Sequence, residues 1–199
     1  MRKVRSFFVP FLLLALLLSF AISHWGCSDQ SPLAPQNSLV TNAEKIHFIP
    51  LTDGSRALSK GQHDQNKASA WVTVKEGGKL KLKYKNDDVK VKVKLQVRPK
   101  TINRDAELTL VLNPLMLDME FGPADIIFSS PAMLNIEAKG LDLSKADPDK
   151  IDIYYVNPLT NKWEKIAREK VKVDIKKGSI KVVNAEIEHF SRYAVGWGE

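Results

Sequence analysis

Cysteine is nearly absent from this chain: Cys27 is the single one among 199 residues, so no internal disulfide bond can form. The three histidines beyond the first 26 residues, His47, His63 and His189, are scattered and lack a nearby cysteine or an HExxH pattern, so the sequence predicts no metal site and no cofactor. No G-x-S-x-G turn marks a hydrolase, although a Ser-His-Asp triad built from distant positions stays open.

Net charge is also low once the N-terminus is set aside. Three of the 30 basic residues lie within the first five positions, which leaves 27 against 23 acidic residues and a net charge of about +4. Proteins that bind the phosphate backbone of nucleic acids usually carry a much larger excess. We therefore expect no nucleic-acid partner.

The N-terminus lacks a hydrophobic run long enough to cross a membrane. Arg2, Lys3 and Arg5 precede 16 mostly apolar residues, Phe7 to Ile22, whereas a transmembrane helix needs about 20. A basic start followed by a short apolar run is typical of a secretory signal peptide. One reading is cleavage after Ala21-Ile22-Ser23, which would leave Cys27 as a free thiol.

The second reading is lipidation of Cys27, which follows the small residue Gly26. The segment resembles the signal of bacterial lipoproteins, which is cut directly before a cysteine that becomes diacylated, although His24 and Trp25 depart from the usual motif. The resemblance implies a signal peptide over residues 1–26 and a membrane anchor at Cys27. Ser28 in place of aspartate implies the outer membrane, with the protein facing the periplasm or the cell surface.

Two regions follow the signal. Residues 27–69 are mostly polar, with scattered apolar residues, and predict a flexible linker. Residues 70–199 alternate between apolar and polar side chains, which is typical of half-buried strands. Turn signals separate short expected strands over 71–74, 80–84, 89–97, 107–112, 124–128, 132–137, 151–156, 162–167, 171–175, 180–183 and 193–197. This pattern predicts an all-β fold, an antiparallel β-sandwich.

Several phrases between residues 71 and 138 resemble the ZU-five domain, a β-sandwich of ankyrins, netrin receptors and many exported bacterial proteins. They are Gly77-Gly78-Lys79-Leu80, Val97-Arg98-Pro99, Phe121-Gly122-Pro123-Ala124 and Phe128-Ser129-Ser130-Pro131-Ala132. Eukaryotic members serve mainly as interaction modules, so the resemblance implies a binding role without naming a partner. We also expect Phe121 and Phe128 to plug the sandwich beside the Gly-Pro bend.

The phrase His189-Phe190-Ser191 resembles the cleavage site of self-cleaving relatives of this domain. There, the hydroxyl of Ser191 would attack the carbonyl carbon of Phe190, and His189 would accept the proton. The alternative is that Phe190 belongs to the core of a last strand while His189 and Ser191 face water or pair with neighbours. We expect the second arrangement and no enzymatic activity.

The expected hairpin over residues 80–97 carries a stripe of lysines that is a candidate for anion binding. Six lysines alternate with apolar residues and share one face, namely Lys81, Lys83, Lys85, Lys90, Lys92 and Lys94. They could bind an anionic glycan, lipopolysaccharide phosphates or the membrane, or they could be a solvated face that opposes aggregation.

Two further groups of residues predict structure rather than a site. Asp142, Asp147, Asp149 and Asp152 do not fit a calcium loop and are better explained as turn residues. Trp71, Trp163 and Trp197 are expected to pack in the core or at strand ends. The sequence thus predicts a lipid-anchored, non-enzymatic binding or structural module of the bacterial cell envelope, with a protein or an anionic glycan as its partner.

Overall fold

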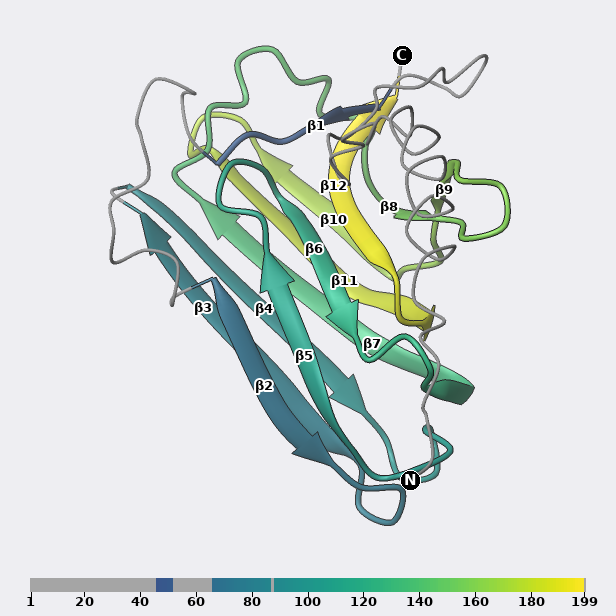
Figure 1. Ribbon diagram of the computed structural model, residues 1–199. Coiled ribbons are helices and arrows are strands. Elements are labelled where there is room, and N and C mark those ends of the chain that lie inside the picture. The colour runs from purple at the N-terminus through teal and green to yellow at the C-terminus, as the bar shows by residue number, and fades with distance from the viewer. Residues whose placement is uncertain (1–45, 52–65, 87, 199) are drawn as a thin grey trace, which may run out of the picture. The chain divides into compact units, whose positions relative to one another are not determined.

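A computed structural model describes residues 46–51, 66–86 and 88–198, all within the compact unit Thr41–Glu199. These residues form twelve strands and no helix, which confirms the expected all-β class (Figure 1). The strands are β1 (Ile46–Phe48), β2 (Lys67–Val72), β3 (Gly78–Asn86), β4 (Val89–Val97), β5 (Ala106–Leu112), β6 (Asp118–Gly122), β7 (Ile127–Lys139), β8 (Ile151–Val156), β9 (Trp163–Lys165), β10 (Lys170–Asp174), β11 (Ser179–His189) and β12 (Arg192–Gly198).

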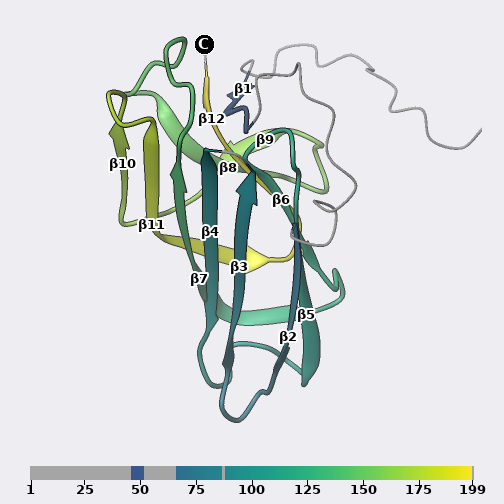
Figure 2. The ribbon, with the colours of Figure 1, turned by 90° about the vertical axis from the view of Figure 1, so that its left-hand side faces the viewer.

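Two antiparallel sheets pack face to face, so the predicted sandwich is confirmed (Figure 2). The seven-stranded sheet has the order β2-β5-β6-β12-β8-β9, and β1 also pairs with β12. The five-stranded sheet has the order β10-β11-β7-β4-β3. The chain crosses from one sheet to the other between β2 and β3 through a sharp bend at Gly77. This residue has a φ of 69°, and a Cβ there would collide with the carbonyl oxygen of Val97.

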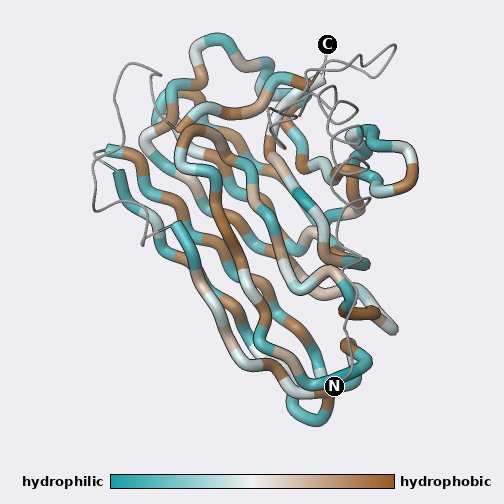
Figure 3. The backbone as a smooth tube through the Cα atoms, in the orientation of Figure 1, coloured by the Kyte–Doolittle hydropathy of each residue, from teal (hydrophilic) through white to brown (hydrophobic). Residues whose placement is uncertain are grey.

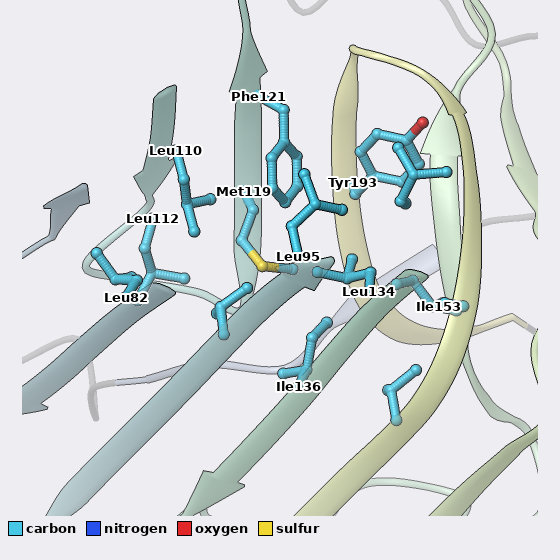
Figure 4. Close-up of a cluster of buried hydrophobic side chains, with 14 of the residues drawn as sticks. Leu82, Leu95, Leu110, Leu112, Met119, Phe121, Leu134, Ile136, Ile153 and Tyr193 are labelled. Carbon is cyan, nitrogen blue, oxygen red and sulfur yellow. The ribbon is translucent and has the colours of Figure 1, made fainter. Parts of the chain in front are cut away.

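The core lies between the sheets and is built by the period of two along each strand. In β3 and β4 the apolar side chains point inward and the lysines outward, and Figure 3 shows the alternation along both strands. Inward residues of both sheets interlock, among them Leu95 and Leu134 from one sheet and Leu110 and Phe121 from the other (Figure 4). Phe121 and Phe128 pack into the sandwich as expected. Phe121 is buried, Phe128 packs against the core, and both rings lie near Phe190.

Part of the expected linker belongs to the sandwich. Strand β1 pairs with β12, and the next residues, Ile49 and Leu51, are completely buried. Strand β2 begins at Lys67, before the predicted domain start at residue 70. A strand of three residues is too short to show a period of two, so the mostly polar composition of residues 27–69 gave no sign of β1. The remainder of residues 27–69, with Cys27, and the signal over 1–26 lie outside the described residues.

Two other expectations are wrong. No separate strand covers 124–128, because Ile127 and Phe128 begin β7, which continues through the expected strand 132–137. Strand β6 was not expected, because Asp118 and Met119 are both buried and break the alternation. Trp71 does not pack in the core: it is 67% exposed on the edge strand β2. Trp163 and Trp197 do pack at strand ends, against Phe48 and His47 respectively. Within the described residues, no helix is long and apolar enough to span a membrane.

Candidate functional site: the lysine face

The structure brings all six predicted lysines together on the outer face of the β3–β4 hairpin. Its register sets them directly opposite one another as the pairs Lys81 with Lys94, Lys83 with Lys92 and Lys85 with Lys90. Five of the six side chains are exposed and Lys94 is half-buried. Directly opposed like charges in a sheet repel each other, so this arrangement lowers the stability of the hairpin.

The register extends this face across the whole five-stranded sheet. Lys139 of β7 lies opposite Lys90, and Lys181 of β11 lies opposite Lys172 of β10. With the remaining outward lysines of β3 and β10, the lysine face comprises Lys79, Lys81, Lys83, Lys85, Lys90, Lys92, Lys94, Lys139, Lys170, Lys172 and Lys181. Sequence reasoning missed five of these residues. Lys79 lies on β3 itself, at the start of the hairpin. The other four alternate with apolar residues in their own strands, but only the strand order places them beside the hairpin.

Few carboxylates share this side of the sheet. Glu137 of β7 lies between Lys92 and Lys181, and its Oε1 is 3.0 Å from Nζ of Lys139. This hydrogen bond lowers the pKa of Glu137, and the charges of Lys139, Lys92 and Lys181 act in the same direction. Asp174 of β10 and Glu186 and Glu188 of β11 also lie on outward positions. Eleven lysines against four carboxylates leave the face positive.

Residues His189, Phe190 and Ser191 form the corner between β11 and β12, where the chain leaves one sheet for the other. Oγ of Ser191 donates a hydrogen bond of 2.9 Å to the carbonyl of Val156. The Phe190 ring is buried against Phe121 and Phe128, and neither Phe190 nor Ser191 has a positive φ. The hydroxyl needed for self-cleavage is thus engaged by another strand.

The ring of His189 faces a small cavity of 210 Å³ beside this corner. It packs edge-on against Tyr155, and its Nε2 is buried with no hydrogen-bond partner. The hydroxyl of Tyr155 donates to Glu164, which lowers the pKa of Glu164, while burial is the main cause that raises the pKa of Tyr155. No described contact links the His189 ring to Oγ of Ser191, so these two groups are not arranged as a base and a nucleophile.

Three of the four aspartates considered for calcium have structural partners for their carboxylates. Asp142 and Asp147 accept hydrogen bonds from the backbone N–H groups of Ser144 and Asp149, which is ordinary turn chemistry. Asp152 is buried and forms a salt bridge with Arg168 at 2.7 Å. Across the described ranges, no three metal-ligating side chains come together.

Comparisons with known proteins leave the family open. No family model matches the chain, and no solved structure does so either. A segment of 55 residues is 49% identical to an amylopullulanase of Thermoanaerobacterium thermosulfurigenes. This segment covers 27% of the chain and 3% of the amylopullulanase, so the chain spans only a small part of that relative.

Proposed function

We propose that this protein is an exported, lipid-anchored and non-enzymatic binding module of the bacterial outer membrane, and that the lysine face is its binding surface for an anionic partner. The export signal and Cys27 support the location, and the likeness to ZU-five domains supports an interaction role. The observation that carries the binding role is the set of three directly opposed lysine pairs on β3 and β4.

These pairs are poorly explained by protection against aggregation. Lysines that block aggregation are needed on edge strands, where unpaired backbone groups could recruit another chain. In the five-stranded sheet only β3 and β10 are edges, whereas β4, β7 and β11 are interior strands and carry Lys90, Lys92, Lys94, Lys139 and Lys181. An anion bound across the face would offset the repulsion between the paired lysines. Without a bound anion, this repulsion remains.

The first prediction concerns three lysines that lie in one row across the face. A variant with Lys83→Gln, Lys92→Gln and Lys181→Gln is expected to bind a sulfated polysaccharide about tenfold more weakly at low salt, since each exposed charge contributes a fraction of a kcal/mol. The measurement is the dissociation constant of the full chain as a function of salt, because exposed charges are screened over about 8 Å at physiological ionic strength.

The matched control is Lys67→Gln, Lys145→Gln and Lys162→Gln. It removes the same net charge from exposed residues outside the five-stranded sheet. We expect it to change binding much less than the first variant. Equal weakening by both variants would mean that net charge alone drives binding and that the lysine face is not a specific surface.

A further inference from the structure

The lysine face is spread in two dimensions. All five strands of the sheet carry at least one outward lysine. One row runs from Lys85 and Lys90 to Lys139. Another runs from Lys83 and Lys92 past Glu137 to Lys181 and Lys172. Adjacent strands are about 4.8 Å apart and alternate residues along a strand about 6.6 Å apart, so the charges form a broad grid. A grid of this kind can contact many anions of a surface at once, whereas a linear polymer would cover one row.

The chemistry of the face is suited to a diffuse anionic surface. All its cations are lysines, which act as mobile point charges, and none is an arginine, whose planar group selects individual carboxylates and phosphates. Along the paired, outward positions of these strands no aromatic side chain offers a platform for sugar rings. The described cavity, beside Tyr155 and His189, is lined by none of the eleven lysines.

The length of chain before the sandwich permits such a contact. Eighteen residues separate Cys27 from Ile46, the first residue of β1. An extended chain of this length reaches up to roughly 60 Å. A domain of about 150 residues has a radius of gyration of only about 15 Å. The lysine face can therefore reach the membrane to which Cys27 attaches the protein, although β1 belongs to the opposite sheet.

We propose that the lysine face docks on the surface of an anionic phospholipid bilayer, the same membrane that holds the acyl chains on Cys27. This inference rests on the proposed lipid anchor and on the proposed binding role of the face. The acyl chains would supply permanent attachment, and the lysines would set the orientation through attraction to lipid head groups. In the docked state the seven-stranded sheet, with the exposed Trp71, faces away from the membrane.

Lysine acetylation measures this orientation directly in the full lipidated protein. The protein is reconstituted into phosphatidylcholine vesicles with or without phosphatidylglycerol, and acetylation of each lysine is followed by mass spectrometry. We expect Lys83, Lys92 and Lys181 to react several times more slowly only in the vesicles that contain phosphatidylglycerol, and high salt to remove the protection. Lys67 and Lys162 should react equally in both vesicles. Unchanged rates for the three face lysines would overturn the proposal.

Binding without the anchor separates this inference from the proposed function. The full chain with Cys27→Ser is expected to sediment with phosphatidylglycerol vesicles, and Lys83→Gln, Lys92→Gln and Lys181→Gln should weaken this partition roughly 100-fold, at about 1 kcal/mol for each lysine near the surface. The control with Lys67→Gln, Lys145→Gln and Lys162→Gln should retain most of it. Binding to sulfated polysaccharide without binding to vesicles would overturn the membrane proposal and leave the binding role standing. Binding to neither would contradict both.

Discussion

At the scale of single residues, the buried charges of this protein belong to its framework. Asp118 of β6 is 3% exposed and accepts hydrogen bonds from Nε and a terminal nitrogen of Arg192 in β12. The guanidinium also lies 5.6 Å from the Trp163 ring, and its side chain is half-exposed. The pair is thus asymmetric, because the carboxylate depends on the arginine while the arginine can also reach water.

This asymmetry predicts unequal effects of removing the two partners. Arg192→Met leaves an ionised carboxylate buried without a partner and should lower the free energy of unfolding by about 3 kcal/mol. Asp118→Asn keeps an acceptor and leaves Arg192 free to turn toward water, so it should cost about 1 kcal/mol. Urea unfolding at neutral pH measures both values.

An exposed pair provides the control for this experiment. Arg104 and Asp125 are 2.6 Å apart, with side chains 47% and 68% exposed. Arg104→Met is expected to cost less than about 1 kcal/mol, because water replaces the lost partner. Similar losses for Arg192→Met and Arg104→Met would show that the burial of Asp118 does not decide the cost.

Individual side chains could be assigned from sequence only where the period fixed their direction. The alternation in β3 and β4 predicted the exposed lysines correctly. It could not reveal that Asp152 pairs with Arg168, because the two residues are 16 positions apart and no local pattern joins them. The expectation for Trp71 was wrong because hydrophobicity favours burial in general, while the alternation along β2 points Trp71 outward beside the buried Val72.

At the scale of strands and turns, the sequence predicted strand positions correctly where apolar and polar residues alternate regularly. It did not do so where a bulge interrupts the alternation. The hairpin and β8 lie where the sequence placed them, whereas β11 continues well beyond the expected 180–183. The strand is interrupted by a bulge between Val182 and Ala185, with Asn184 at a φ of 49°. A bulge shifts the pattern of inward and outward side chains by one residue. The second half of β11 is therefore out of phase with the first half and was not predicted as part of the same strand.

The corner between β11 and β12 predicts an uncut chain. Because Oγ of Ser191 is held by the carbonyl of Val156, we expect the intact mass of the purified protein to include every residue up to Glu199. Ser191→Ala should leave that mass unchanged apart from the substitution, and should cost about 1 kcal/mol of stability through the lost hydrogen bond.

His189→Ala tests the same corner from the other side. It removes the ring that packs on Tyr155 but not the carbonyl that accepts the 2.6 Å hydrogen bond from Tyr193, so the chain should again remain whole. A product ending at Phe190 that disappears in Ser191→Ala and forms more slowly in His189→Ala would instead establish self-processing.

At the scale of the whole molecule, the sequence predicted the class of fold but only part of the proposed site. Period-two patterns separated by turns are sufficient to indicate a sandwich. The strand order β10-β11-β7-β4-β3 depends on pairings between distant segments, such as Lys92 with Glu137 and Glu137 with Lys181. For that reason Lys139, Lys170, Lys172 and Lys181 could not be joined to the hairpin lysines from local patterns alone.

The proposed membrane location depends on Cys27, and Cys27→Ser is the variant that tests it. Two acyl chains on this residue should hold the protein in the membrane fraction even at high salt, whereas the lysine face alone gives an attachment that salt reverses. We therefore expect the variant to move into the soluble fraction when membranes are washed with high salt, while the unaltered protein stays bound. Intact mass of the membrane-extracted protein should show a chain that begins at Cys27 with added acyl groups. A soluble protein that begins at His24 with a free thiol would contradict the anchor and support ordinary signal cleavage after Ser23.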